Sequence, residues 1–341
     1  MRPENLNLDW ARGQLEDCRL CPRQCRVNRL QNETGWCKAA ANVTCFMEYV
    51  GYGEEPELTP SHTLFLTHCS MDCIWCQTAD EQATSPHVRL TPQSLQRIVA
   101  RGISEGARNL NLLGGEPVVN LPGLLLLFAE LDELPPIVWN SNSYCCADAL
   151  EVLDGLVSVY AMDLKTSSSE CAAKLTKTPD YPEVAKARLV ELYHRCPERI
   201  LLRHLVLPGH FACCTRPSLE WIAAALPGVR VSLQDYVVMP RARPDASLGH
   251  FLSAEEFARA KGLAGELGIP LVERLPGQAT APAMAVQQQL DLGKPINGEK
   301  TIDIELILSP EGKLFLRHPN RPAAALAADI VNPQPGTGGV L

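Results

Sequence analysis

Short apolar runs alternate with segments of helical period over most of the middle of the chain. Each run is rich in Val, Ile and Leu, and polar or turn-forming residues bound it, which is typical of buried β-strands. We expect strands at residues 63–67, 109–113, 137–140, 157–162, 200–207 and 229–233.

Helices are expected between these strands, because several segments begin with recognisable start signals. Thr91 precedes a proline and an amphipathic segment, and Ser253 with Glu256 forms a capping box. Further helices are expected to open at Pro182 and Pro217. Alternating strands and helices predict parallel strands with right-handed crossovers, so the fold class is α/β. A partial or full (β/α) barrel and an open doubly wound sheet both fit this alternation.

The two ends of the chain differ from this middle part. Residues 1–60 are rich in cysteine and show little hydrophobic periodicity. We therefore expect an N-terminal extension that needs a cross-link, such as a bound metal, to hold its shape. Residues 61–275 would form the main domain and residues 276–341 a C-terminal extension. Within the latter, 301–308 and 313–318 flank a Ser-Pro-Glu-Gly turn and predict a β-hairpin, whereas the Pro- and Gly-rich stretch 332–341 predicts a flexible tail.

Composition narrows the classes of protein. The 341 residues are 46% hydrophobic and carry a net charge of −8, with aromatics at only 6%, so we expect no nucleic-acid partner. The longest apolar run, 124–129, is too short to span a membrane, and the polar N-terminus lacks a signal-peptide core. We therefore expect a cytoplasmic protein whose 14 cysteines favour metal over disulfides.

Three of these cysteines, Cys69, Cys73 and Cys76, stand in a C-x3-C-x2-C spacing directly after the first strand of the main domain. They supply three thiolates, one fewer than a cubane iron–sulfur cluster needs for full protein ligation. One iron would then be open to a small molecule. The structural alternative is three cysteines that merely fall close together.

Polar residues follow the other strands at their carboxyl ends, where parallel α/β folds bind ligands. The second strand ends in Gly114-Gly115-Glu116-Pro117 and the third in Asn140-Ser141-Asn142. Asp163 and Lys165 end the fourth strand, and the fifth carries Arg203 and His204. Each group alone has an ordinary reading, such as a turn, a surface ion pair or a core histidine.

Taken together, these motifs resemble the radical S-adenosylmethionine (SAM) superfamily. The resemblance rests on CSMDCIWC, GGEP, the Asp163–Lys165 segment and RHLVLPG. The N-terminal CRLCPRQCRVNR, the GEEP at 53–56 and PIVWNSN are similar to a branch related to the pyruvate formate-lyase activating enzyme. The resemblance implies a partial (β/α)6 TIM-like barrel and covers residues 15–275.

The resemblance also implies a role for each motif. Cys69, Cys73 and Cys76 would hold a [4Fe–4S] cluster whose open iron binds SAM, and Trp75 would meet the adenine. The remaining cofactor-binding positions implied are Gly114, Gly115, Glu116, Pro117, Asn140, Ser141, Asn142, Asp163, Lys165 and His204.

The implied activity is reductive cleavage of SAM to a 5′-deoxyadenosyl radical, which abstracts hydrogen from a protein, peptide or small-molecule substrate. A flavodoxin- or ferredoxin-type reductant would be a partner. The alternative is a non-catalytic iron–sulfur or zinc protein that carries electrons or serves as an assembly scaffold. That class predicts metal without a SAM site.

Other cysteines depart from the pattern of the family. Cys18, Cys21, Cys25 and Cys37 offer four thiolates, for which a structural zinc, a second iron–sulfur cluster and free thiols all remain open. The vicinal pairs Cys145-Cys146 and Cys213-Cys214 follow the third and fifth strands, and would either meet substrate or a second metal or be ordinary loop residues. Cys171 and Cys196 are interpreted as packing residues.

Overall fold

A computed structural model describes residues 6–53, 55–272, 305–308 and 314–317 of the chain. Two compact units are distinguished, Met1–Ala279 and Thr280–Leu341. In the described part of the second unit, β9 (Glu305–Leu308) and β10 (Leu314–Arg317) pair antiparallel, with Leu314 opposite Leu308. This pairing confirms the predicted hairpin, whereas the predicted flexible tail at 332–341 lies outside the described residues.

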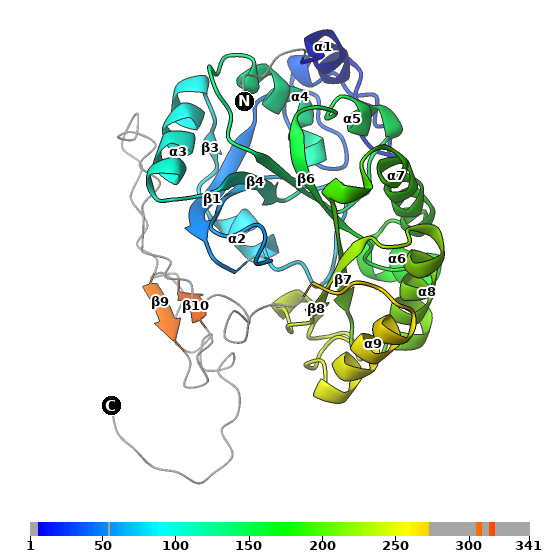
Figure 1. Cartoon of the computed structure of the whole chain (residues 1–341). Coiled ribbons are helices and arrows are strands. Elements are labelled where there is room, and N and C mark those ends of the chain that lie inside the picture. Colours follow the sequence, from blue (N-terminus) through cyan, green and yellow to red (C-terminus); the bar gives the residue numbers. More distant parts are fainter. Residues whose placement is uncertain (1–5, 54, 273–304, 309–313, 318–341) are drawn as a thin grey trace, which may run out of the picture. The chain divides into compact units, whose positions relative to one another are not determined.

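The described part of the first unit is built on one curved eight-stranded sheet with helices outside it (Figure 1). Its strand order is β3-β1-β2-β4-β5-β6-β7-β8, and β2 to β8 in this order are parallel. The strands are β1 (Thr44–Gly51), β2 (Ser61–Leu66), β3 (Val88–Arg89), β4 (Asn109–Gly114), β5 (Ile137–Ser141), β6 (Val157–Asp163), β7 (Ile200–Val206) and β8 (Arg230–Asp235). The six predicted strands are thus present, and the sheet is not closed into a barrel within the described residues, as expected of a partial barrel.

The helices confirm the predicted start signals. Thr91 and Ser253 each accept a hydrogen bond from the backbone of the third helical residue and form capping boxes for α3 and α9. The helices are α1 (Leu8–Glu16), α2 (Ala79–Thr84), α3 (Pro92–Ser104), α4 (Pro117–Phe128), α5 (Ala147–Glu151), α6 (Ser169–Thr176), α7 (Tyr181–Arg195), α8 (Arg216–Ala225) and α9 (Ala254–Glu266), with 3-10 turns at η1 (Arg29–Gln31), η2 (Pro197–Arg199) and η4 (Pro240–Ala242) and a π-helix, η3 (Phe211–Thr215).

One strand departs from the sequence expectation. β1 lies within the predicted N-terminal extension, yet it pairs antiparallel with β2, with Tyr49 opposite Thr63. Buried and partly exposed residues do not alternate regularly along β1. The sequence therefore lacks the period-2 pattern that would predict a strand there. The division at residues 60 and 275 stays a prediction, but the main sheet begins before residue 61.

The sheet has an inner face and a face that meets the helices. Leu58, Val138, Ala161 and Leu201 pack together as one buried apolar cluster. Two residues after Leu201 on β7, the buried Arg203 binds Glu55 with nitrogen–oxygen distances of 3.0 and 2.5 Å. Since side chains alternate along a strand, Arg203 shares the inner face with Ala161 and Leu201.

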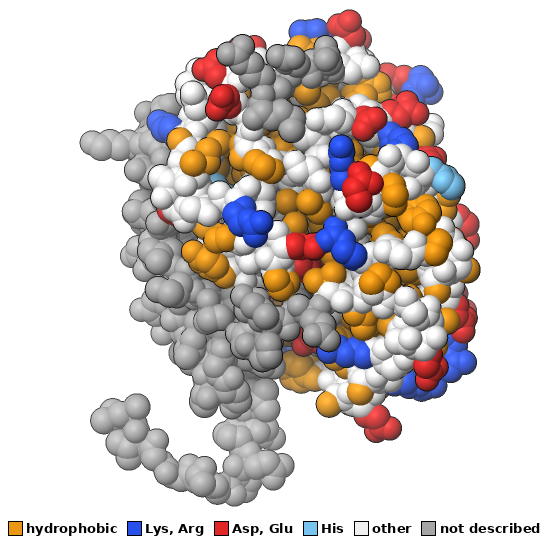
Figure 2. All heavy atoms as spheres, in the orientation of Figure 1, with side chains coloured by type: hydrophobic (Ala, Val, Ile, Leu, Met, Phe, Trp, Pro, Cys, Tyr) orange, Lys and Arg blue, Asp and Glu red, His pale blue; other side chains and the backbone are white. Residues whose placement is uncertain are grey.

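The surface of the described part carries charges of both signs. Figure 2 shows acidic and basic side chains interspersed with apolar ones over the visible face. None of the described helices combines the length and the apolar character that a membrane crossing requires.

Candidate functional site

The three cysteines of the C-x3-C-x2-C spacing lie in the loop between β2 and α2, at the carboxyl end of β2. Cys69, Cys73 and Cys76 are half-buried free cysteines. The loop is held by the end of α6, because the amide of Asp72 donates to the Thr176 carbonyl and that of Ile74 to the Leu175 carbonyl, both at 3.0 Å. Three thiols are therefore presented by a backbone that is fixed from outside the loop.

The Gly114-Gly115 turn at the end of β4 is pressed against the start of this loop. Gly114 has a φ of +116°, a conformation that favours glycine, and a Cβ on Gly115 would overlap the His68 carbonyl. The amide of Gly115 donates to the Leu66 carbonyl and the next amide to the His68 carbonyl, each at 2.7 Å. The glycines thus let β4 hold the backbone that leads into Cys69.

The carboxylate of Glu116 joins the ends of β4 and β5. It caps α4 through the Val118 amide at 3.1 Å, and it accepts from the Ser141 hydroxyl and the Asn142 amide at 2.8 Å each. Pro117 is the first residue of that helix. Burial raises the pKa of Glu116 to about 7, although the three donors act against this rise. The structure therefore gives this carboxylate three protein donors besides the ligand role predicted for it.

Two asparagines lie at the carboxyl end of β5, and one of them reaches the cysteine loop. The Asn142 side-chain amide lies 3.6 Å from Cys69 Sγ and 3.5 Å from the Ser70 hydroxyl. The Nδ2 atom of Asn140 is buried and has no hydrogen-bond partner among the described residues. A buried amide of this kind is where a polar ligand is expected to bind.

Asp163 and Lys165 form an ion pair at the end of β6, with Nζ 2.5 Å from Oδ2. The Tyr181 hydroxyl fixes this turn, because it donates to the Asp163 carbonyl at 3.0 Å and accepts from the Lys165 amide at 2.9 Å. The charges of Asp163 and Cys73 raise the pKa of Lys165 and outweigh its burial. The ammonium group is therefore a fixed positive charge beside the cysteine loop.

Burial dominates the ionisation of Cys69 and Cys73. It raises the pKa of Cys73 to about 12, despite the opposing charge of Lys165. The pKa of Cys69 is also raised, first by burial and then by the charge of Glu116. A bound metal would stabilise the thiolates of Cys69 and Cys73 against this effect of burial.

Two predicted positions differ from the others in what they contact. Trp75 packs in an apolar cluster with Leu175 and Leu207, and it is 5% exposed. His204 is fully buried, with Nδ1 2.6 Å from the Leu164 carbonyl and Nε2 3.2 Å from the Thr215 hydroxyl.

His204 therefore faces the helix side of β7, opposite to Arg203, because neighbouring strand residues point to opposite faces. This geometry favours the structural alternative, a hydrogen-bonded core histidine. Its contact with a cofactor stays a prediction.

The four N-terminal cysteines meet around one cavity. Cys18, Cys21, Cys25 and Cys37 line it together with Arg29. The Arg29 guanidinium donates to Cys18 Sγ at 3.0 Å and lies 3.9 Å from Cys37 Sγ.

This cavity adjoins the main site. Arg23, which also lines the cavity, donates to the carbonyl of Ser70 at 2.7 Å, and Arg29 donates to the carbonyl of Val119 in α4 at 2.6 Å.

The remaining cysteines divide into two settings. Cys145 is buried, and the Cys146 amide donates to the Leu20 carbonyl, so this pair supports the N-terminal segment. Cys213 and Cys214 instead meet Cys171 and His210. The interpretation of Cys171 as a packing residue was incomplete, because its partners lie about 40 residues away. The spacing His210-x2-Cys213-Cys214 was the available signal in the sequence.

Comparison with known proteins gives one family match. Residues 63–222 match the Radical SAM superfamily. The chain is 29% identical over 276 residues to the uncharacterized protein MJ0674 of Methanocaldococcus jannaschii, covering 79% of this chain and 80% of the relative. The family match supports a radical SAM enzyme and implies a [4Fe–4S] cluster and SAM.

Solved structures with a similar arrangement are more distant. Streptococcus suis SuiB bound to its precursor peptide SuiA is 14% identical, with a TM-score of 0.42 over 60% of this chain and 45% of SuiB. A radical SAM methyltransferase from Sphaerobacter thermophilus is 17% identical, with a TM-score of 0.44 over 63% and 67% of the two chains. This chain spans about half the length of SuiB.

Proposed function

We infer the function from the radical SAM superfamily domain that this chain carries over residues 63–222. We propose an enzyme that cleaves SAM reductively and uses the product to abstract hydrogen from a protein, peptide or small-molecule substrate. The observation that carries this proposal is the convergence of the Cys69–Cys76 loop, the glycine turn and the β5 and β6 ends at one edge of the sheet. A reductant of flavodoxin or ferredoxin type would supply the electron.

The residues present fit a [4Fe–4S] cluster. Cys69, Cys73 and Cys76 are free thiols on one loop, and the loop backbone is fixed by α6 and β4. The Lys165 ammonium and the Asn142 amide would offset the charge of the thiolates. These three cysteines would hold the cluster, with one iron left open.

The same edge offers groups suited to SAM. The Asn140 amide lacks a protein partner, and Asp163 with Lys165 presents a carboxylate and an ammonium at the next strand. Gly114 and Gly115 let this turn pack against the backbone that precedes Cys69, Pro117 begins α4, and Glu116 with Ser141 would hold the turn in shape. When bound, the cluster and SAM would supply a 5′-deoxyadenosyl radical as the hydrogen-abstracting species.

We propose further that Cys18, Cys21, Cys25 and Cys37 hold a second iron–sulfur cluster. All four line one cavity, and the Arg29 guanidinium that reaches Cys18 would stabilise thiolate charge there. Gly35 belongs to this arrangement, since a Cβ there would overlap Cys25. Zinc in the same cavity is the competing occupant, and metal analysis separates the two.

The placement within the branch related to the pyruvate formate-lyase activating enzyme belongs to the same proposal. It rests on the N-terminal cysteine motif and the GEEP segment, whose Glu55 binds Arg203 inside the sheet. A glycine of a partner protein is the substrate that this branch suggests. Substrates of peptide or small-molecule type are tested beside it.

The deciding experiment is anaerobic reconstitution with iron and sulfide, followed by reduction in the presence of SAM and measurement of 5′-deoxyadenosine. We expect deoxyadenosine from the full chain and none from the Cys69→Ala/Cys73→Ala/Cys76→Ala variant. A fully iron-loaded protein that makes none with dithionite or with a flavodoxin system would instead support the non-catalytic alternative. The iron content of the triple variant would measure how much iron the N-terminal cysteines bind.

A further inference from the structure

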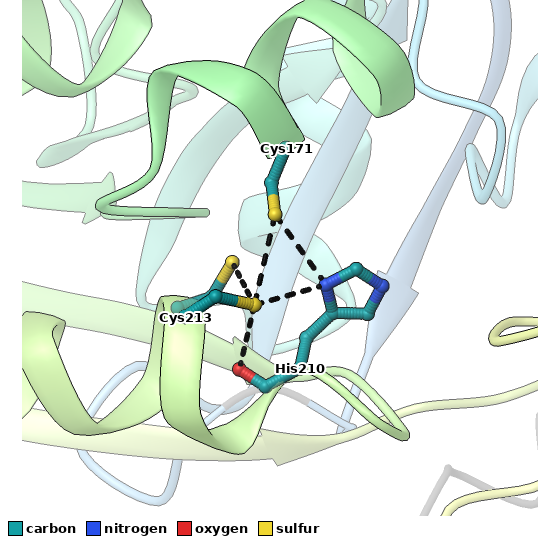
Figure 3. Close-up of side chains that lie close together, drawn as sticks. Cys171, His210 and Cys213 are labelled. Atoms are coloured by element: carbon teal, nitrogen blue, oxygen red, sulfur yellow. Dashed lines mark hydrogen bonds between the residues drawn. The ribbon is translucent and has the colours of Figure 1, made fainter.

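A second group of metal-ligand side chains lies apart from the cysteine loop and the N-terminal cavity. Cys171 of α6, His210 before η3, and Cys213 and Cys214 of η3 have their ligand atoms within 4.8 Å of one another. Figure 3 shows the Cys171 and Cys213 sulfurs and the His210 ring turned toward one another from two separate segments. Among the described residues, this is the one group of His, Cys, Asp or Glu side chains whose ligand atoms lie close enough together to share a metal ion.

The distances match those of ligands that share one tetrahedral ion. With Zn–S near 2.3 Å and Zn–N near 2.0 Å, tetrahedral geometry separates two sulfurs by about 3.8 Å and sulfur from nitrogen by about 3.5 Å. Cys213 Sγ lies 3.6 Å from Cys171 Sγ, 3.7 Å from Cys214 Sγ and 3.4 Å from His210 Nδ1. Cys171 Sγ lies 3.5 Å from the same nitrogen.

Small rearrangements would complete the set. The widest pair among the four ligand atoms is no more than 4.8 Å apart, so it must close by at most about 1.3 Å for one zinc ion. Sulfur atoms this close fit a single ion better than a multi-iron cluster, whose ligands sit on different irons. Three thiolates with one imidazole are a donor set that zinc prefers.

The surroundings of His210 have the features of a metal ligand. Its Nε2 lies 3.0 Å from the Ser247 hydroxyl, and that hydroxyl donates to Asp245 Oδ1 at 2.5 Å. The ring therefore donates through Nε2–H and leaves Nδ1 as the free base that faces the sulfurs. Metal-bound histidines are oriented in this way by their second nitrogen.

The thiol side is supported similarly. The Thr166 hydroxyl lies 2.9 Å from Cys214 Sγ, where it would donate to a thiolate. η3 is a π-helix, a rare form that is frequent at functional sites. This short helix places the consecutive residues Cys213 and Cys214 beside Cys171 and His210.

We propose that Cys171, His210, Cys213 and Cys214 bind one zinc ion. Binding would release the three thiol protons and give a site with a net charge of −1. It would tie α6 to η3 across the segments that follow β6 and β7. Because α6 also holds the Cys69–Cys76 loop through Thr176 and Leu175, the ion would fix the helix that supports this loop.

The test measures zinc in the full chain, isolated from zinc-supplemented cells, by elemental analysis. We expect about one zinc per chain from this site, lost in Cys171→Ser/Cys213→Ser and retained in Cys18→Ser/Cys37→Ser. Zinc lost only from the second variant, or an intramolecular Cys171–Cys213 or Cys213–Cys214 disulfide in a zinc-free protein, would overturn the proposal.

Two further measurements guard against a variant that merely misfolds. His210→Cys supplies a fourth thiolate and should retain zinc, whereas His210→Ala should bind it more weakly, with circular dichroism confirming that both fold. X-ray absorption at the zinc edge of the Cys18→Ser/Cys37→Ser protein should give three sulfur ligands and one nitrogen ligand. Oxygen-dominated coordination there would contradict the assignment.

Discussion

The Cys69–Cys76 loop and the Cys171 group are both cysteine sites, yet they are built in opposite ways. The loop takes its three thiols from eight consecutive residues, and distant backbone groups on α6 and β4 hold it in place. The Cys171 group takes its ligands from two segments, and its shape depends on how α6 packs against η3. A local motif is therefore visible in the sequence, whereas a site assembled across elements emerges only when the chain folds.

The largest expected effect separates the two regions by function. Replacing Cys69, Cys73 and Cys76 by alanine should abolish 5′-deoxyadenosine formation, because no thiolate remains for the cluster, while zinc at the Cys171 group stays. Chromatography of the reaction mixture measures 5′-deoxyadenosine, and elemental analysis measures the zinc content. Cys196→Ala, which removes a buried cysteine that belongs to neither group, is the matched control. Equal loss of zinc and cluster in the triple variant would show that the regions are not independent.

A change in the shared scaffold should weaken both regions. Glu55→Gln leaves the buried Arg203 guanidinium without its carboxylate, and breaking such a pair costs about 3–5 kcal/mol. Urea unfolding of both proteins at pH 7 measures the difference in the free energy of unfolding. A difference below about 1 kcal/mol would mean that the pair contributes little.

The pH dependence of this pair follows from the pKa of Glu55. Burial acts to raise that pKa, but the charge and hydrogen bonds of Arg203 outweigh it and lower it from 4.5 to about 2. The stabilisation is thus complete above about pH 4.5 and is lost as the pH falls toward about 2. The gap in stability between wild type and Glu55→Gln should narrow over this range.

Gly115→Ala tests the loop alone. The added Cβ would meet the His68 carbonyl and displace the backbone before Cys69, and a shift of about 1 Å can lower a rate about 100-fold. Deoxyadenosine formation should fall by that order, with zinc at the Cys171 group unchanged. Gly262→Ala is the control, since nothing lies within 4 Å of a Cβ there. Wild-type turnover in Gly115→Ala would contradict the role given to the turn.

The smallest effect is expected at the Cys171 group. Ser247→Ala removes the acceptor for His210 Nε2–H, and loss of such a partner weakens metal binding by about 10–100-fold. Competition with a chelator measures the zinc affinity. Ser169→Ala is the control, because that serine lies on α6 but bonds to Glu183. Equal affinities for the two variants would remove Ser247 from the site.

The sequence by itself determined the alternating strands and helices, because burial on a parallel sheet demands continuous apolar runs and capping residues mark helix starts. It also determined the Cys69–Cys76 motif and the glycine turn, whose residues are neighbours along the chain.

Tertiary structure decided that β1 joins the sheet, that Glu116 caps α4 while holding β5, and that His204 faces the helices. It also brought Cys171 to His210. These features depend on which strand edge is free and which faces meet, and residue spacing does not encode contacts between segments about 40 residues apart.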